Sequence, residues 1–536
     1  MKALVFLLAC CLLLPATAER PNVVLIMVDD MGYSDLGCYG GEIETPNIDS
    51  LAGNGLRFTQ FYNSARCCPT RATLLTGLHP HQVGIGHMTR EEGPAAKNAP
   101  PAYRGNINDS CVTLAEVAKS AGYSTFMTGK WHLAGSDQAD WPLQRGFDRY
   151  YGCIAGAVHY FHPYGKRLIY EGNEVVRNPA STTDRPFYTT DAFADHAIRF
   201  ITDHEAGPEK DSPFFLYLAF NAPHWPLHAH DEELAKYRGK YRLGWDKLRE
   251  QRFARQKASG LIPPSWKMSP RDPEVPAWDS LDREKQRESA ERMSAYAAVI
   301  DRLDQKIGDV IQTLKKTGEF ENTLILLLSD NGACAEVSLM GAGDPVTDRS
   351  PGTDLTRPSY GKAWANASAT PYRLYKHFAH EGGANTPFIA HWPARIGPGR
   401  EWYREPAQLI DVMATLVDVS KATYPQDFHG HEILPIDGVS LKPAFDGDSL
   451  RRPQPIFIEH ENNAFVRDGE WKLVGRDVTP PSGLKPKRWE LYHMTEDGTE
   501  LHDLAEDSPE RVSRMSAMWE AWAKRAHVYP KPGGRK

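Results

Sequence analysis

The chain has 536 residues, of which 41% are hydrophobic and 24% are charged. This length suits roughly three or four small domains, or one large α/β domain with a smaller one, and the hydrophobic content supports a sizeable core and excludes a mostly disordered chain. The formal net charge of -7, from 62 basic and 69 acidic residues, lacks the basic footprint of a protein that binds nucleic acid.

The N-terminus has the features of a secretory signal peptide. Lys2 is followed by an apolar run at residues 3–14, and small residues lead to Ala18. We therefore expect residues 1–18 to be a signal peptide that is cleaved after Ala18, and the mature protein to be secreted or periplasmic. This run and every later apolar stretch fall short of the ~20 residues that cross a bilayer, so no membrane span is predicted.

Eight cysteines are present, and two of them, Cys10 and Cys11, belong to the predicted signal peptide. The other six are Cys38, Cys67, Cys68, Cys111, Cys153 and Cys334. They are sparse and irregularly spaced, which argues against a disulfide framework, and no Cys-x-x-Cys pair indicates structural zinc. Because neither disulfides nor zinc account for these cysteines, we expect one of them to have a chemical role.

Strands and helices alternate through most of the chain. Asn22–Val28 is a continuous apolar run of the kind found in strands that are buried on both faces. Further strands are predicted at 124–128, 214–220 and 323–328, and helices at 113–120, 191–204 and 293–314. Apolar spacings of three and four in the last helix suit packing on a sheet better than a coiled coil. The alternation predicts an α/β fold with a doubly wound, mostly parallel sheet and helices on both faces.

The pattern changes after about residue 450. Short strands are predicted at 455–459, 464–467, 471–474 and 489–492, followed by a helix from Pro509 to about Arg525. We therefore predict a large N-terminal domain at 19–450 and a smaller subdomain at 451–536, made of an antiparallel sheet plus a helix. Three long stretches, 135–190, 225–285 and 332–372, interrupt the alternation and are interpreted as lids or binding walls.

Polar residues follow four of the predicted strands. They are Asp29 and Asp30, Lys130 and His132, Asn221 and His224, and Asp330 and Asn331. A single polar residue after a strand is usually a turn or a helix cap. Ligands, however, bind where the carboxyl ends of parallel strands converge, so we expect these side chains to gather at one edge of the sheet.

The acidic part of this group would offer only oxygen ligands, from Asp29, Asp30, Asp330 and Asn331. Hard oxygen donors favour Ca²⁺ or Mg²⁺ over zinc. Three clustered carboxylates would also repel one another strongly without a divalent cation. Arg71, Lys130 and Lys376 would form the cationic face of an anion site, although a surface position is the default for either lysine alone.

The segment that starts at Cys67 reads CCPTRATLLTG. Its Cys-x-Pro-x-Arg pattern, followed by Thr-Gly, resembles the signature of the type I sulfatases, in which the first Cys is oxidised to Cα-formylglycine. Pro69 at +2 and Arg71 at +4 select Cys67, because Cys68 has the wrong spacing to both. Further matches follow in the family's order from about residue 21 to 395, and ELYH and ELHDLAED match near the C-terminus. They include PNVVLIMVDDMGYSDLGCYGG, TPNIDSLA, GKWHLAG, APHWP, LLSDNG, and EGG five residues after Lys376.

This resemblance implies an alkaline-phosphatase-like fold, a catalytic role for residues 19–450 and one bound metal, normally Ca²⁺ and less commonly Mg²⁺. The metal-ligand positions match Asp29, Asp30, Asp330, Asn331 and the modified Cys67. Arg71 and Lys130 match residues that hold the formylglycine hydrate, and His132 matches the residue that assists its turnover. His224 and Lys376 match residues that contact the sulfate and the leaving oxygen.

The implied reaction is hydrolysis of a sulfate monoester of a carbohydrate or an aryl group. Conversion of Cys67 to 3-oxoalanine implies a formylglycine-generating, or sulfatase-maturating, enzyme as a partner. One hydroxyl of the aldehyde hydrate would attack sulfur, and the second, deprotonated by His132, would expel sulfate and restore the aldehyde. The leaving alcohol would take a proton from His224 or a lysine.

Other interpretations of these residues stay open. A formylglycine-dependent relative could hydrolyse phosphonate monoesters or phosphodiesters, and a protein with an unconverted thiol could bind sulfated glycans without catalysis. Cys67 could also be an inert buried thiol. Four other histidines, His79, His81, His87 and His159, are interpreted as either structural or substrate-facing, and a structural role is favoured. The sequence specifies neither the sulfate ester nor the oligomeric state.

Overall fold

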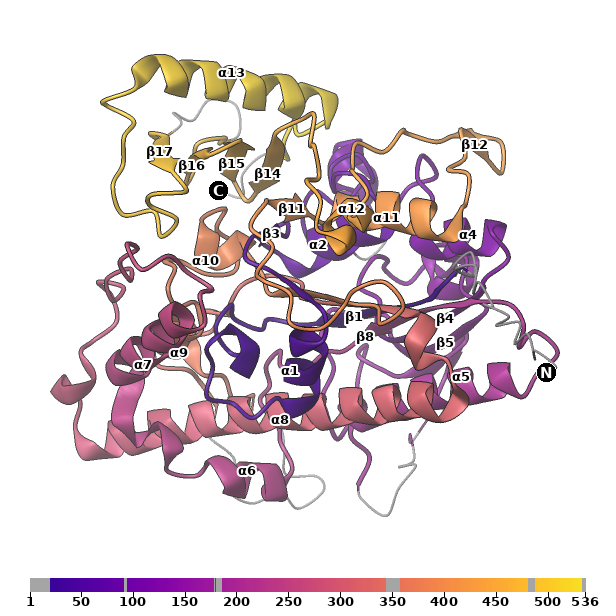
Figure 1. Cartoon of the computed structure of the whole chain (residues 1–536), viewed down its shortest axis with the longest axis horizontal. Helices are drawn as coiled ribbons and strands as arrows, with labels where there is room; N and C mark the ends of the chain where they lie inside the picture. Colours follow the sequence, from indigo (N-terminus) through magenta and orange to yellow (C-terminus); the bar gives the residue numbers. More distant parts are fainter. Residues whose placement is uncertain are drawn as a thin grey trace, which may run out of the picture.

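The computed structural model describes residues 20–90, 94–177, 179, 186–343, 357–480 and 487–532 (Figure 1). The predicted signal peptide and parts of the interruptions at 135–190 and 332–372 lie outside these residues. The main sheet has the strand order β2-β10-β9-β1-β8-β4-β5-β6-β7. Its strands are β1 (Asn22–Val28), β2 (Leu56–Phe58), β4 (Ser124–Lys130), β5 (Arg149–Cys153), β6 (Tyr170–Glu171), β7 (Glu174–Val175), β8 (Phe214–Ala219), β9 (Thr323–Ser329) and β10 (Phe388–His391).

Strand β1 lies in the middle of the parallel part of this sheet. It pairs in parallel with β8 and β9, and Val24 lies opposite Leu216 and Ile325. Val24 belongs to the hydrophobic cluster on one face, whereas the next residue, Leu25, belongs to the cluster on the other face. Successive side chains of a strand point to opposite faces, so a strand covered on both sides is apolar throughout.

Helices cover both faces of the sheet, which confirms the predicted doubly wound fold. Figure 1 shows the sheet between α8 on one side and α2 and α11 on the other. Helices α1, α5, α6, α7, α8 and α9 contribute to the hydrophobic cluster on one face, and α2, α4, α11 and α12 to the other. Their bounds are α1 Pro46–Gly53, α2 Cys67–Thr76, α4 Leu114–Ser120, α5 Thr189–Glu205, α6 Asp231–Tyr237, α7 Gly244–Ala258, α8 Arg283–Thr317, α9 Gly361–Ser368, α10 Glu381–Ala384, α11 Ile410–Ser420 and α12 Lys442–Asp446.

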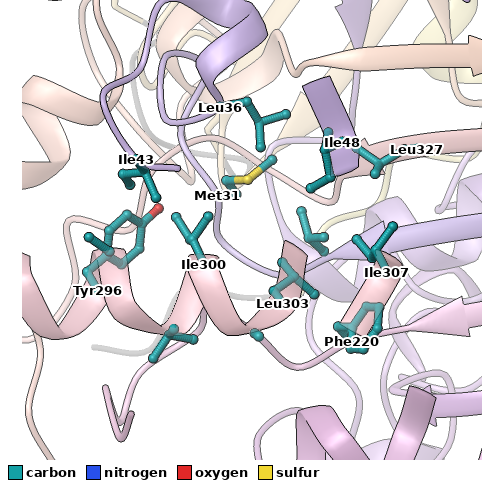
Figure 2. Close-up of a cluster of buried hydrophobic side chains, with 14 of the residues drawn as sticks. Met31, Leu36, Ile43, Ile48, Phe220, Tyr296, Ile300, Leu303, Ile307 and Leu327 are labelled. Atoms are coloured by element: carbon teal, nitrogen blue, oxygen red, sulfur yellow. The ribbon is translucent and has the colours of Figure 1, made fainter. Parts of the chain in front are cut away.

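Helix α8 has 35 residues and packs along the sheet. It begins after Asp282, whose side chain accepts a hydrogen bond from the backbone N–H of Lys285, and ends at Gly318, which is left-handed at φ 88°. Figure 2 shows Leu303 and Ile307 of this helix within the same cluster of buried side chains as Met31 and Leu327. The apolar stripe therefore packs against the sheet, as the sequence predicts.

The C-terminal region forms the predicted antiparallel sheet with one helix. Its strands follow the order β14-β15-β16-β17 and are β14 (Ile456–His460), β15 (Asn463–Asp468), β16 (Trp471–Gly475) and β17 (Glu490–His493). Helix α13 (Pro509–Arg525) packs Met515, Trp519 and Trp522 against this sheet. The boundary between residues 450 and 451 stays a prediction.

The structure differs from the sequence-based expectation at the sheet edges and in the interruptions. Strands β2 and β10 form an antiparallel edge, and β6 and β7 form the other. These four strands have two to four residues each, too few to show a pattern. Helices α6 and α7 lie within 225–285, and α9 lies within 332–372. Across the described residues, every helix is too short or too polar to cross a membrane.

Candidate active site

The ends of two neighbouring parallel strands bring the predicted acidic residues together. Val28 of β1 pairs with Ser329 of β9, so Asp29 and Asp330 are the next residues along adjacent strands. The backbone N–H of Asp30 donates to Asp330 Oδ1 at 3.1 Å, and Asn331 Nδ2 donates to Asp30 Oδ1 at 2.7 Å. All four residues are buried. The register of β1 with β9 therefore explains why residues so distant in sequence form one cluster.

Two candidate residues have a left-handed backbone. Asp30 has a φ of 69° and His132 a φ of 58°. Such conformations cost a non-glycine residue roughly 1–3 kcal/mol and persist where surrounding contacts hold them. The hydrogen bonds from and to Asp30 supply such contacts, and the backbone N–H of His132 is held by Ile154 O at 3.1 Å.

Cys67 is the first residue of α2, and Arg71 lies one turn further along the same face. Both side chains are buried, with Cys67 only 2% exposed. Arg71 donates from Nη2 to Asp330 Oδ2 at 2.9 Å and from Nη1 to the backbone carbonyl of Lys130 at 3.0 Å. Burial raises the pKa of Asp29 and of Asp330, and the nearby charge of Cys67 adds to both rises. The helix start and the acidic cluster therefore share one pocket.

Three buried cations balance the three carboxylates. Lys130 Nζ lies 2.7 Å from Asp29 Oδ2, and Lys376 Nζ lies 2.9 Å from Asp30 Oδ1. Arg71, which bonds to Asp330, also lies 3.9 Å from Asp29. Although burial acts in the opposite direction, the Lys376 ammonium holds the pKa of Asp30 below its ordinary value. Buried charges need such partners, because an unpaired one is strongly destabilising.

Two acceptor atoms of this cluster lack a hydrogen-bond partner within the described part of the chain. They are Asp29 Oδ1 and Asn331 Oδ1, and both are shielded from solvent. A buried acceptor without a partner costs about 1–3 kcal/mol, so such atoms point to a missing ligand. Carboxylate and amide oxygens are the donors that Ca²⁺ and Mg²⁺ prefer. The residues present therefore fit a hard divalent cation.

His132 follows β4 and contacts the residue next to Cys67. Its Nε2 lies 3.1 Å from Cys68 Sγ. Burial lowers the pKa of His132 to about 4, so the imidazole is neutral at neutral pH. A hydrogen bond from Cys68, assisted by the charge of Lys130 and a hydrogen bond from His132, holds the pKa of the Cys67 thiol well below its ordinary value, although burial acts in the opposite direction.

His224 follows β8 and faces the same acidic cluster. Its Nδ1 contacts the backbone carbonyl of Trp225 at 2.6 Å, which leaves Nε2 at 3.4 Å from Asp30 Oδ2. Burial lowers the pKa of His224 below its ordinary value. The Trp225 ring stacks on the imidazole with ring centroids 5.6 Å apart. The structure thus brings together all ten residues that the sequence indicates.

Two contacts of this pocket are not predicted from the sequence. Glu336 accepts from Lys376 Nζ at 3.1 Å and from Arg66 Nη1 at 2.7 Å. Tyr217 places its hydroxyl 3.5 Å from Arg71 Nη1. Glu336 lies in an interruption without periodicity, and Tyr217 lies inside an apolar strand, so local pattern marks neither. The sequence could have indicated Glu336 only by its position soon after the end of β9, and Tyr217 only by its place on the side of β8 that faces the site.

Three of the four other histidines contact the C-terminal region. His81 Nε2 is 2.8 Å from Glu459 Oε2, and His79 packs edge-on against Trp522 with ring centroids 4.9 Å apart. His159 stacks near His228, with ring centroids 4.2 Å apart. His87 belongs to a separate cluster, described below.

Comparison with known proteins matches both regions of the chain. Residues 21–422 match the sulfatase family, and residues 372–524 match the C-terminal region of N-sulphoglucosamine sulphohydrolase. The chain is 33% identical to an uncharacterised sulfatase of Schizosaccharomyces pombe, over 94% of this chain and 93% of the relative. It is 35% identical to an arylsulfatase of Klebsiella aerogenes, over 80% and 92% of the two chains. It is also 29% identical to an N-acetylgalactosamine-6-sulfatase of Canis lupus familiaris, over 82% and 68%.

A solved structure shares the fold over nearly the whole length. The crystal structure of Ps i-CgsB in complex with k-i-k-neocarrahexaose superposes with a TM-score of 0.67 at 24% identity, covering 94% of this chain and 93% of the other. This likeness confirms the alkaline-phosphatase-like architecture. The family match over residues 21–422, together with the relatives that are 33% and 35% identical, establishes that the chain belongs to the sulfatase family and is a sulfuric ester hydrolase.

Proposed function

We propose that this protein hydrolyses a sulfate monoester of a carbohydrate and that Cys67, converted to formylglycine, provides the nucleophile. The observation that carries the proposal is the buried cluster in which Cys67 lies with three cationic side chains and a set of oxygen ligands. Three carboxylates balance these three cations in formal charge, so a bound divalent cation would leave the pocket positive. A positive, water-poor pocket stabilises the negative charge that shifts during sulfate transfer.

One Ca²⁺ is the proposed metal, with Mg²⁺ as the less favoured choice. Its proposed ligands are Asp29, Asp30, Asp330, Asn331 and the modified Cys67. Such a cation supplies Lewis-acid chemistry, because it neutralises sulfate oxygens and lowers the pKa of a hydroxyl next to it. The unpartnered Asp29 Oδ1 and Asn331 Oδ1 support this assignment.

The hydrated aldehyde of formylglycine offers two hydroxyls on one carbon, one to attack sulfur and one whose deprotonation releases sulfate. Arg71 and Lys130 would orient these hydroxyls from the helix and strand that carry them. His132 Nε2 would accept the proton of the second hydroxyl, because burial keeps the ring neutral at neutral pH and so able to take up a proton. Lys376 Nζ, or His224 Nε2 when the imidazole is doubly protonated, would protonate the leaving oxygen.

A carbohydrate is the proposed leaving group. Trp225 is half-buried and lies between His224, on which it stacks, and Glu336, to which its Nε1 donates at 3.4 Å. An aromatic face beside hydrogen-bonding side chains is the surface that sugars pack against. The N-acetylgalactosamine-6-sulfatase relative and the neocarrahexaose complex of Ps i-CgsB support the same substrate class.

A sulfate-release assay tests this proposal. A panel of sulfated saccharides and one chromogenic aryl sulfate would be incubated with the protein in calcium and, in parallel, after treatment with chelator. We expect turnover of at least one saccharide sulfate that chelation abolishes and calcium restores. Aryl phosphonate and phosphodiester substrates run beside them, and faster cleavage of these than of every sulfate would favour the phosphonate or phosphodiester hydrolase alternative.

Mass spectrometry tests the nucleophile and the export signal. In protein made together with a sulfatase-maturating enzyme, the peptide that contains Cys67 is expected to carry formylglycine. The exported protein is expected to begin at Glu19, after cleavage of the signal peptide, in a secreted or periplasmic fraction. Fully active material with an unmodified Cys67 thiol would contradict the proposed chemistry.

A further inference from the structure

Outside the candidate active site, three histidines surround the carboxylate of Glu461. His87 Nε2 lies 3.2 Å from Glu461 Oε1, and His460 Nε2 lies 3.5 Å from the same oxygen. His377 Nδ1 lies 2.6 Å from the other oxygen, Oε2. The potential ligand atoms of His377, His460 and Glu461 all lie within 4.8 Å of one another. Three imidazoles therefore converge on a single carboxylate.

These residues come from three segments that are distant in sequence. His87 follows α2, His377 lies next to Lys376, and His460 and Glu461 lie at the end of β14 and the start of the turn that follows it. Asn463 of β15 also donates from Nδ2 to the backbone carbonyl of His377 at 2.9 Å. The cluster therefore lies where the small C-terminal sheet meets the segment that carries Lys376.

His460 has unmet bonding capacity. It is fully buried, and neither of its ring nitrogens has a hydrogen-bond partner within the described ranges. Its 3.5 Å approach to Glu461 is too long for a strong hydrogen bond. Because leaving buried polar atoms unpaired is costly, a partner for this ring is expected.

The spacing and the donor types favour a transition metal over calcium. Around a tetrahedral Zn²⁺ with bonds of about 2.0–2.1 Å, neighbouring ligand atoms lie roughly 3.3–3.4 Å apart. The two distances from Glu461 Oε1, 3.2 Å to His87 and 3.5 Å to His460, bracket this value. Imidazole nitrogens suit zinc and related ions, whereas Ca²⁺ prefers oxygen ligands throughout.

We propose that His87, His377, His460 and Glu461 form a second metal site, separate from the oxygen-rich cluster, that binds a divalent transition metal such as Zn²⁺. A metal there would join the C-terminal sheet to the catalytic pocket. His377 Nε2 lies 3.1 Å from Glu336 Oε1, and the other oxygen of Glu336 accepts from Lys376 at 3.1 Å. The site would thus hold Glu336, and through it Lys376, in place.

Zinc binding by the full-length protein tests the proposal. The protein is stripped with chelator, dialysed against Zn²⁺ in excess Ca²⁺, and its bound zinc is measured by atomic emission together with its melting temperature. We expect about one zinc per chain and a zinc-dependent rise in melting temperature. Both effects should be lost in His460→Ala and Glu461→Gln. The zinc affinity of these variants should fall by more than the roughly 10- to 100-fold expected when a residue that only supports a metal ligand is removed.

Controls separate this site from others and from misfolding. All variants carry Cys67→Ala and Cys68→Ala, because Cys67, Cys68 and His132 form another group of potential ligands. His87→Ala, at a side chain that is 40% exposed, serves if His460→Ala fails to fold. His391→Ala, at a buried histidine that ends β10, is the matched control and is expected to keep its zinc.

Two results would overturn the proposal: no zinc bound by the parent protein, or equal zinc content in the parent and the ligand variants. The readout is metal content rather than sulfate release, so failure of this site is distinguishable from failure of the proposed hydrolysis.

Discussion

Lys130, Asp29, Arg71 and Asp330 form a network of ion pairs whose side chains are fully buried. Each of these charged side chains is stabilised by an oppositely charged neighbour, because a buried charge that loses its partner is left uncompensated. Even a conservative substitution in this network is therefore expected to affect both the stability of the protein and its catalysis. Informative single-residue tests therefore use side chains whose removal leaves no orphaned charge.

Cys67→Ala meets this condition, because it removes one sulfur atom and leaves the ion pairs of this network in place. We expect kcat to fall by on the order of 10³-fold or more, since the proposed nucleophile is lost. The free energy of unfolding is expected to change by only about 1 kcal/mol. Initial rates of sulfate release and thermal melts measure the two effects.

Cys68→Ala is the matched comparison, one position along the same buried helix. It lacks the spacing to Pro69 and Arg71, so this variant is expected to retain turnover. If Cys68→Ala were inactive and Cys67→Ala active, the nucleophile would be the other thiol.

His79 makes stability depend on pH. Burial lowers its pKa to about 3, whereas in the unfolded chain the pKa returns to about 6.5. Below about pH 6.5 the unfolded state therefore binds a proton that the folded state does not, and the free energy of unfolding falls as pH falls toward 3. His79→Gln is expected to reduce the loss between pH 7.5 and pH 5 by about 1–2 kcal/mol.

Denaturant unfolding at the two pH values measures this difference. His502→Gln, at an exposed position, is the control and should show the pH dependence of the parent protein. An unchanged pH dependence in His79→Gln would show that His79 is not the group responsible.

At the scale of elements, the strands that position the pocket are those that the sequence predicts best. Strands β1, β8 and β9 are continuous apolar runs because both their faces are covered, and the polar residues that end them mark the site. The antiparallel edges escape prediction, because β2 and β10 are defined by pairing with partners hundreds of residues away rather than by local pattern.

The same distinction applies to the pocket. Asp29 and Asp330 are predicted because strand ends converge at one sheet edge. The position of Glu336 is not predicted, because this residue contacts Lys376 from a loop whose path depends on packing. The clustering of histidines around Glu461 cannot be predicted from the sequence either, because the three segments that carry them meet only after folding.

Helix α8 offers a test of element packing. Leu303 is fully buried between this helix and the sheet (Figure 2). Leu303→Ala is expected to lower the free energy of unfolding by about 2–5 kcal/mol, because it leaves a cavity in a close-packed core. Gln312→Ala, at an exposed position of the same helix, is expected to stay within about 0.5 kcal/mol. Equal effects in chemical denaturation would show that α8 does not pack as described.

At the scale of the whole molecule, one buried lysine connects the C-terminal sheet to the large domain. Lys472 of β16 lies 2.6 Å from Glu381 of α10 and 2.8 Å from Glu500, and all three side chains are buried. The pairing spans the contact between the two parts of the fold. Their association therefore depends on charge compensation as well as on apolar packing.

Lys472→Met is expected to destabilise the protein by about 3–5 kcal/mol, because two carboxylates are left buried without their cation. Adding Glu381→Gln and Glu500→Gln should recover part of this loss. Lys487→Met is the control, because its pair with Asp477 is exposed and contributes little. A Lys472→Met protein that melts at the parent temperature would contradict this account of the junction.

The burial of α2 also sets an order of events. All ten of its residues, Cys67 included, are enclosed once the fold is complete. If Cys67 is converted to formylglycine as proposed, the modifying enzyme is expected to act before α2 is buried. On this proposal, modification of Cys67 would compete with folding, and a molecule that folds first would keep its thiol and lack activity. Slower folding would thus raise the fraction of active molecules.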